Sequence, residues 1–362
     1  MKSTLVNNPS AYCVIMAGGI GSRFWPVSRA GKPKQFLDIL GTGRTMLEET
    51  CDRFEGIVPF DNFLVMTGEQ FQEQVLNLIP SLKPAQVLTE PERRNTAPAI
   101  AYAAYRIFKQ NPEAVMIVTP SDHFIGDEEA FRNVLNKAIE HASSHDELVT
   151  VGIKPTYPAT GYGYIELASD GEGDGGFSKV LRFKEKPDLT EAKELLRKGN
   201  YLWNSGMFVW KARTIVDALE KYLPDVAVHF AEIREFETPT AAERIRDAFK
   251  ASPAISIDYG VMERADNVSC IAGDFRWDDV GTWTSLHRLQ QKMELQDAKC
   301  LFGEDSEDTI VRTTFPGKKV VTIGLKDYLV VDTPDILLIA PKEDEKRLHE
   351  YLRRYAKETD TE

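Results

Sequence analysis

Short apolar runs separated by helical patterns fill the first 150 residues, and this alternation constrains the fold more than any other feature. Between the runs, Thr45 and Glu48 form a capping-box pattern ahead of a helix, and residues 69–79 and 97–109 follow helical spacing. Strands that alternate with helices indicate a mostly parallel sheet wrapped by helices. The sequence therefore predicts a Rossmann-like, doubly wound α/β fold with a mixed sheet. The runs with the length and character of buried strands are residues 12–17, 63–67, 114–119 and 148–152.

The pattern changes after residue 156, where shorter β segments begin. Residues 163–167, 179–184 and 206–210 are expected to join the same sheet and to form its ligand-binding half. A helical run over residues 284–294 follows. We therefore predict one large domain over residues 1–295 and a small β domain over residues 296–362 that ends in a helix. The strands expected in the small domain are residues 310–313, 319–323, 328–331 and 336–339.

Composition excludes several classes of protein. The formal net charge of −12 argues against nucleic acid as a partner. No apolar run approaches the ~18 residues of a membrane span, and residues 1–10 lack a targeting pattern, so we expect a cytoplasmic protein. The cysteines lack the close spacing of a zinc site or a disulfide framework, so we expect reduced, mostly structural thiols. They are Cys13, Cys51, Cys270 and Cys300.

The turn after the first predicted strand combines glycines with basic side chains. Residues 18–26 read Gly-Gly-Ile-Gly-Ser-Arg-Phe-Trp-Pro, and residues 33–36 read Pro-Lys-Gln-Phe. Glycines let backbone N–H groups approach a phosphate or a base edge, while Arg23 and Lys34 add positive charge. Residues 18–37 hold four basic and no acidic side chains, against the acidic balance of the whole chain. This combination favours a site for a nucleoside triphosphate.

Two common phosphate-binding loops do not fit this turn. A P-loop requires Ser or Thr after Gly-Lys, whereas Pro33 follows Gly31 and Lys32. A dinucleotide fingerprint that began at Gly19 would require a small residue where Phe24 stands. An ordinary strand-to-helix turn with three glycines stays open as the alternative.

The glycine-rich stretch and the Pro-Lys-Gln-Phe after it resemble the pyrophosphorylase signature of the sugar nucleotidyltransferases. Seven further motifs follow in order, and together the eight are similar to the mannose-1-phosphate guanylyltransferase branch over roughly the first 290 residues. They are Arg-Asn-Thr-Ala-Pro-Ala (94–99), Pro-Ser-Asp-His (120–123), Thr-Gly-Tyr-Gly-Tyr-Ile (160–165), Phe-Lys-Glu-Lys-Pro (183–187), Trp-Asn-Ser-Gly-Met (203–207), Ser-Ile-Asp-Tyr-Gly (256–260) and Trp-Asp-Asp-Val-Gly-Thr-Trp (277–283).

This resemblance implies a nucleotidyltransferase, GT-A-like catalytic domain with a C-terminal β-helix-like unit. The implied reaction joins GTP and mannose 1-phosphate into GDP-mannose and pyrophosphate, by in-line attack of the sugar phosphate on the α-phosphorus. The resemblance also implies Mg²⁺ as cofactor and a homodimer through the C-terminal domain. Trp25, where related pyrophosphorylases often carry Leu, fits the guanylyltransferase branch.

Transfer of a nucleotidyl group requires alignment and charge neutralisation more than covalent help from the protein. The resemblance assigns the GTP phosphates to Arg23 and Lys34, and the phosphate of mannose 1-phosphate to Lys186. Asp122 follows a predicted buried strand, where open α/β sheets place their ligands, and is the first candidate for Mg²⁺. The family's other metal-binding aspartate corresponds to Asp279.

The resemblance assigns recognition of the base and of the sugar to glycines and polar side chains. A sugar hydroxyl requires directional donors and acceptors, and glycine permits close backbone approach. The nucleotide-binding set is Ala17, Gly18, Gly19, Gly21, Asn95 and Thr96. The sugar-binding set is Gly161, Gly163, Glu185, Asn204 and Asp258.

Structural alternatives accompany several of these assignments. Either aspartate at 278–279 could cap the helix that follows, and Asn95 or Thr96 could cap the helix that begins there. His141 and His145 stand four apart on a helical stretch without a third metal ligand nearby, and we expect them on a solvated surface.

Two functional alternatives also stay open. Another nucleoside triphosphate and sugar 1-phosphate could be the substrates, because selectivity rests on a few polar contacts. The chain could instead be a nucleotide-sugar sensor without catalysis.

Overall fold

The computed structural model describes residues 9–19, 22–168, 174–292, 301–302, 307–315 and 317–355 of the 362-residue chain. Two compact units divide the chain. The first comprises residues 1–18, 51–120 and 125–277, and the second comprises residues 19–50, 121–124 and 278–362. Gly21, Cys300 and the predicted domain boundary at residues 295–296 lie outside the described residues.

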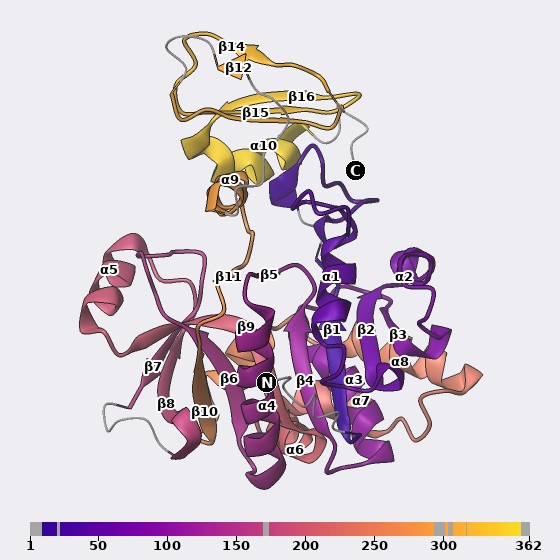
Figure 1. Cartoon of the computed structure of the whole chain (residues 1–362). Helices are drawn as coiled ribbons and strands as arrows, with labels where there is room; N and C mark the ends of the chain where they lie inside the picture. The colour runs from indigo at the N-terminus through magenta and orange to yellow at the C-terminus, as the bar shows by residue number, and fades with distance from the viewer. Residues whose placement is uncertain are drawn as a thin grey trace. The chain divides into compact units, whose positions relative to one another are not determined.

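The first unit is built on a nine-stranded mixed sheet in the order β3-β2-β1-β4-β9-β6-β10-β8-β7 (Figure 1). The mixed α/β fold predicted from the sequence is therefore confirmed. The strands are β1 (Ala11–Met16), β2 (Phe63–Gly68), β3 (Val87–Glu90), β4 (Val115–Pro120), β6 (Leu148–Ile153), β7 (Tyr164–Leu167), β8 (Phe177–Lys184), β9 (Tyr201–Lys211) and β10 (Val268–Gly273). Two short strands, β5 (Phe124–Ile125) and β11 (Trp277–Asp278), stand where the chain passes between the units.

The strand directions place the loops that follow several strands along one edge of this sheet. β1 pairs in parallel with β2 and β4, and β2 pairs in parallel with β3. β9 runs antiparallel to both β4 and β6, so β4 and β6 share a direction. Trp203, near the start of β9, pairs with Ile153 at the end of β6. The carboxyl ends of β1, β3, β4 and β6 and the start of β9 therefore lie along one edge, where α/β sheets bind ligands.

Helices cover both faces of the sheet. Val14 belongs to the core that includes α3 and α6, whereas its buried neighbours Cys13 and Ile15 do not, as alternation along a strand requires. α4 packs against β4, β6, β9 and β10. The helices of the first unit are α2 (Gln72–Leu78), α3 (Thr96–Gln110), α4 (Glu128–Ser144), α5 (Leu189–Lys198), α6 (Ala212–Tyr222), α7 (Pro224–Ala231) and α8 (Pro239–Ala251).

All four strands predicted before residue 156 are present, as are the helices expected around residues 45 and 97–109. The predicted capping box exists at the start of α1 (Met46–Arg53), since Thr45 N donates to Glu48 Oε2 at 2.8 Å and Glu48 N donates to Thr45 Oγ1 at 3.3 Å. β3 and β10 were not among the predicted strands, because β3 is short and β10 contains Ser, Cys, Ala and Gly.

The second unit assembles segments that are far apart in the sequence around one apolar cluster. Phe24, Met46, Trp283 and Val331 are members of this cluster. The unit contains α9 (Trp283–Lys292) and α10 (Leu348–Tyr355). Both helices are predicted from the sequence, but the prediction placed the first of them in the large domain. β13 (Ile310–Thr313) pairs in parallel with β15 (Tyr328–Asp332), which pairs antiparallel with β16 (Leu337–Pro341), while β12 (Leu301–Phe302) pairs in parallel with β14 (Val321–Thr322).

Polar contacts hold these segments to one another. Arg29 donates two hydrogen bonds of 2.6 Å to the carboxylate of Asp335. This bidentate contact lowers the pKa of Asp335 to about 2. The carboxylate of Glu345 accepts from the backbone N–H groups of Trp283 and Thr284, so it occupies the positive end of α9. A carboxylate 62 residues from Trp283 in the sequence thus fixes where this helix begins.

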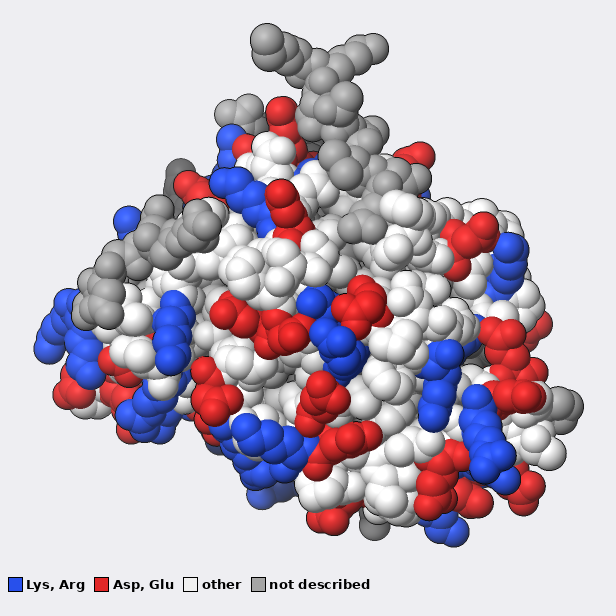
Figure 2. Space-filling view, turned by 90° about the horizontal axis from the view of Figure 1, so that it is seen from below, with Lys and Arg blue, Asp and Glu red and all other residues white. Residues whose placement is uncertain are grey.

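Charged side chains of both signs are interspersed over the face in Figure 2. Ion pairs among the described residues include Arg106 with Glu237 at 2.9 Å and Lys211 with Asp146 at 2.8 Å. None of the described helices combines the length and the apolar character that a membrane crossing requires.

Gly152 tests how tightly the sheet is packed. A Cβ at this position would lie 2.6 Å from Leu202 Cδ1 and 2.7 Å from Cys270 Sγ. We expect Gly152→Ala to lower the free energy of unfolding by about 1–3 kcal/mol, because the buried neighbours must move. Gly31→Ala is the control, since no atom lies within 4 Å of its Cβ position. Equal denaturation midpoints for the two variants would contradict this interpretation.

Candidate active site

Lys34 is the centre of a charged cluster in the second unit. Its side chain is 4% exposed, and its Nζ donates to Asp122 O at 2.9 Å, to Asp122 Oδ2 at 3.1 Å and to Asp279 O at 2.9 Å. A lysine ammonium has three N–H donors, so these acceptors satisfy all of them. Lys34, Asp122 and Asp279, which are predicted from the sequence to share one site, are therefore in direct contact.

The carboxyl group of Asp122 stays acidic in this setting. Burial acts to raise its pKa, but the charges of Lys34, His123 and Arg23 and the hydrogen bond from Lys34 bring the pKa below its ordinary value. Arg23 itself is exposed. Asp122 is therefore ionised at neutral pH, as a ligand for a hard cation must be.

The segment around Asp279 is a strained turn. Val280 is fully buried and has φ of 45°, a left-handed conformation that is costly for a β-branched residue. Asp278 Oδ1 accepts from Val280 N at 2.8 Å, and Asp279 Oδ1 accepts from Gly281 N at 3.0 Å. A Cβ at Gly281 would lie 2.6 Å from Asp279 Oδ2, so any side chain there would displace the Asp279 carboxylate.

Neither aspartate caps the helix that follows. α9 begins at Trp283, and Thr282 Oγ1 accepts from Ser285 N at 3.0 Å. The helix-cap alternative for positions 278–279 is thus wrong, because the turn uses both carboxylates before the helix starts. Burial and the charge of Asp279 raise the pKa of Asp278 to about 6.

Asp122 and Asp279 together offer two hard oxygen donors. Within the described residues, no group of three or more His, Cys, Asp or Glu side chains is arranged to hold a metal ion. Mg²⁺ is commonly held by one or two carboxylates together with substrate phosphates and water. The residues present therefore fit Mg²⁺ bound with a nucleotide, rather than a cation caged by the protein alone.

A second cluster forms in the first unit where β1 and β3 end. Glu90, the last residue of β3, is 8% exposed. Its Oε1 lies 3.0 Å from the position of a Cβ on Gly18. Burial raises the pKa of Glu90 to about 7, although the charge of Arg93 opposes the shift. Glu90 is not among the residues predicted from the sequence, where its only signal is a carboxylate at the end of a short apolar run.

Structural contacts use several of the predicted nucleotide-binding groups. Ala17 N donates to Met66 O at 2.7 Å, so this N–H is already bonded. Asn95 has φ of 65° and caps α3, since its Oδ1 accepts from Thr96 N at 2.9 Å. Thr96 Oγ1 accepts from Ile257 N at 2.9 Å. The cap alternative for Asn95 is therefore confirmed, while its role toward a nucleotide stays a prediction.

The predicted sugar-binding residues meet at the start of β9. Asn204 Nδ2 donates to Asp258 Oδ1 at 2.7 Å, and Asn204 N donates to Gly163 O at 2.8 Å. A Cβ on Gly163 would lie 2.5 Å from Glu185 Oε2, so glycine makes room for this carboxylate. Lys186 Nζ lies 2.6 Å from Glu185 Oε1, with 61% of its side chain exposed.

Burial and the nearby charge of Glu185 raise the pKa of Asp258 to about 6, although the hydrogen bond from Asn204 opposes this shift. At neutral pH, the free protein therefore holds in this cluster a carboxylate whose ionised form is destabilised by its surroundings.

Aromatic rings fix the loop that carries Gly163. The ring of Tyr162 lies 5.0 Å from that of Trp203 and 5.2 Å from that of Trp277, both in edge-on geometry. Gly161 is exposed, with no atom within 4 Å of its Cβ position, so it is open to solvent on the same loop. In the second unit, Gly19 is likewise exposed, and its carbonyl accepts from Gln35 Nε2 at 2.9 Å.

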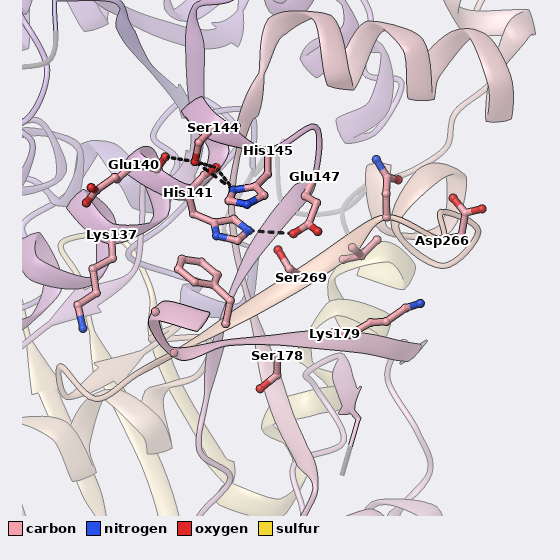
Figure 3. A pocket seen from close by; sticks show the side chains of 15 residues that line it. Lys137, Glu140, His141, Ser144, His145, Glu147, Ser178, Lys179, Asp266 and Ser269 are labelled. Atoms are coloured by element: carbon pink, nitrogen blue, oxygen red, sulfur yellow. Dashed lines mark hydrogen bonds and ion pairs between the residues drawn. The ribbon is translucent and has the colours of Figure 1, made fainter. Parts of the chain in front are cut away.

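A cavity of about 940 Å³ lies at the other edge of the sheet, where β6 and β10 begin, and no predicted site residue lines it (Figure 3). The His141 ring stacks on Phe177 at 3.9 Å and on His145 at 4.2 Å, and its Nε2 is 2.9 Å from Glu147 Oε2. The solvated position expected of both histidines holds for His145 but is wrong for His141, whose side chain is 15% exposed.

Asp258→Asn tests the strain in the sugar cluster. The folded protein binds the Asp258 proton more tightly than the unfolded chain does, so this group destabilises the fold as pH rises from about 4 through 6. We expect the free energy of unfolding of the variant, relative to that of the parent, to increase by roughly 1–3 kcal/mol as the pH rises from 4.5 to 7.5. Chemical denaturation at both pH values measures it, with the exposed Asp266→Asn as control. If the difference in free energy of unfolding between variant and parent did not change with pH, the ionised Asp258 would not be destabilised in the folded protein.

Comparisons with known proteins find relatives over most of the chain. The family model described as nucleotidyl transferase matches residues 12–296, and that of the MannoseP isomerase/GMP-like beta-helix domain matches residues 303–354. The latter match confirms the β-helix-like unit that the resemblance implied.

The chain is 38% identical to the mannose-1-phosphate guanylyltransferase of Escherichia coli K12, covering 94% of this chain and 73% of the relative. It is 37% identical to the mannose-1-phosphate guanylyltransferase ManC of Salmonella typhimurium, covering 96% and 74%. A crystal structure of a mannose-1-phosphate geranyltransferase from Thermus thermophilus superposes with a TM-score of 0.81 at 32% identity, covering 96% of this chain and 99% of the other. The chain belongs to the nucleotidyl transferase family.

Proposed function

We propose that this protein makes GDP-mannose and pyrophosphate from GTP and mannose 1-phosphate, with Mg²⁺ as cofactor. The observation that carries the proposal is the cluster in which Asp122 and Asp279 surround one buried ammonium, with Arg23 close enough to lower the pKa of Asp122. The names of the Escherichia coli and Salmonella relatives support the choice of substrates.

The chemistry requires no nucleophile from the protein. An oxygen of the sugar phosphate forms the new bond to the α-phosphorus of GTP, and the bond from that phosphorus to the bridging oxygen breaks, so pyrophosphate leaves with the electron pair. Mg²⁺ would neutralise phosphate charge, held by Asp122 and Asp279. Arg23, which is exposed, would add a guanidinium suited to two phosphate oxygens.

Lys186 is suited to the phosphate of the incoming sugar. Its ammonium is mostly exposed and has Glu185 as its ion-pair partner. Because the Lys186 ammonium reaches solvent although the Glu185 side chain is only 12% exposed, a phosphate can approach the ammonium from the solvent side. Glu185, Asn204 and Asp258 would then offer acceptors and a donor to the sugar hydroxyls.

Glu90 supplies a physical basis for choosing guanine. Guanine presents two adjacent donors, N1–H and the 2-amino group, whereas adenine presents an acceptor at N1. An ionised carboxylate only accepts, so Glu90 would pair with guanine and oppose adenine. Two hydrogen bonds from the base would also stabilise the charge that burial now disfavours.

Cys13, Cys51 and Cys270 are buried cysteines, and thiols of this kind suit the reducing cytoplasm that we propose as the location. The homodimer implied by the resemblance stays a prediction.

The test of the function is pyrophosphate release by the purified protein with Mg²⁺. Each of GTP, ATP, UTP, CTP and dTTP is offered with mannose 1-phosphate or glucose 1-phosphate. We expect release with GTP and mannose 1-phosphate well above every other pair. Release with a different pair would overturn the substrates but keep the reaction, and nucleotide-sugar binding without release would make the protein a sensor.

Glu90→Gln tests base selection. The amide places a donor against one of guanine's donors, so we expect kcat/KM for GTP to fall about 10- to 100-fold and the preference over ATP to shrink. The affinity of the parent protein for GTP should rise between pH 6 and 8, as a carboxyl group of pKa about 7 ionises, whereas that of the variant should not.

Glu92→Gln, at an exposed position two residues away, is the control for this substitution. Unchanged discrimination in Glu90→Gln would show that Glu90 does not read the base.

A further inference from the structure

All the N–H donors of the Lys34 ammonium already form hydrogen bonds within the protein. Its three N–H groups are bonded to two oxygens of Asp122 and to the carbonyl of Asp279, and its side chain is 4% exposed. A phosphate could therefore contact this ammonium only if at least one of these hydrogen bonds breaks. The binding of GTP phosphate that the resemblance implies for Lys34 requires a rearrangement.

The position of the ammonium is also informative. All three of its acceptors belong to Asp122 and Asp279, the residues whose carboxylates suit Mg²⁺, and these residues stand 88 and 245 positions from Lys34 in the chain. An ammonium bonded to Asp122 Oδ2 occupies an oxygen that a divalent cation would use. Its charge also repels a second cation over the few ångströms involved.

We propose that the Lys34 ammonium occupies the cation position between Asp122 and Asp279 in the nucleotide-free protein, and that it must leave Asp122 before a divalent cation can bind there. This inference rests on the proposed function, which supplies Mg²⁺ as the cation. The triphosphate offers the displaced ammonium new acceptors, so metal and nucleotide bind together and the free protein binds metal weakly. Lys34 is then a positioning residue that holds the two aspartate segments in register until the substrate arrives.

The geometry allows such an exchange without unfolding. Lys34 starts a short 3₁₀ turn (Lys34–Phe36) after Pro33, and its Nζ lies 5.4 Å from the centre of the Phe24 ring. Four side-chain torsions separate the ammonium from this fixed backbone, so rotation of the stem can move the charge while the turn stays in place.

The test measures Mg²⁺ binding to the nucleotide-free protein by isothermal titration calorimetry. We expect Lys34→Met to bind Mg²⁺ at least about tenfold more tightly than the parent, because a competing charge has been removed from the site. Lys34→Arg keeps the charge and should bind as weakly as the parent. Lys32→Met, at an exposed position two residues away, is the control and should leave the affinity unchanged.

A gain in affinity separates this role from a merely structural one, since a lysine that only held the fold together would weaken metal binding when lost. Equal or weaker binding by Lys34→Met would overturn the proposal. So would tighter binding that persists in the double variant Lys34→Met with Asp122→Asn, because the metal would then lie elsewhere.

If Lys34→Met does not fold, the parent protein still decides the matter. Mn²⁺ binding to the nucleotide-free parent, followed by electron paramagnetic resonance, should be weak, and tight binding would overturn the proposal. Failure here is distinct from failure of the proposed function, because Mg²⁺-dependent pyrophosphate release can be present whatever these titrations give.

Discussion

The ammonium group of Lys34 is buried, and a buried cation is stable only where acceptors surround it. Here the acceptors come from Asp122 and Asp279, so three distant stretches of chain must meet at one atom. This requirement explains the composition of the second unit, which joins residues 19–50 and 121–124 to the C-terminal part of the chain. The strained turn at Val280 is tolerated because Asp278 and Asp279 both bond its backbone.

In the first unit, two carboxyl groups are buried at positions where their charged forms destabilise the protein. Glu90 and Asp258 both have raised pKa values because burial disfavours their charged forms. Both lie along the edge where parallel strands end, and neither contributes to the apolar core. Such groups destabilise the free protein unless a ligand supplies donors, which is the behaviour expected of recognition residues rather than structural ones.

Much of the site was predictable because its signals are local. A glycine-rich turn after a buried strand, and an aspartate after another, mark the edge of the sheet from spacing alone. Glu90 gave no such signal, since it ends a strand of four residues and is brought beside Gly18 by strand order. The helix-cap interpretation of positions 278–279 is wrong because these carboxylates accept from the N–H groups of Val280 and Gly281 instead. Those hydrogen bonds depend on a left-handed backbone that cannot be predicted from the sequence.

The sequence by itself determined the alternation of strands and helices, the motifs in their order and the kinds of side chain available for phosphate, metal and sugar. These features depend on neighbours within a few residues, so local propensity and spacing reveal them. Only the tertiary structure decided that the donors of Lys34 are all taken, that Glu345 caps α9 and that Asp258 sits against Asn204. Those contacts join segments tens to hundreds of residues apart, and their consequences for charge follow from burial, which a sequence pattern does not contain.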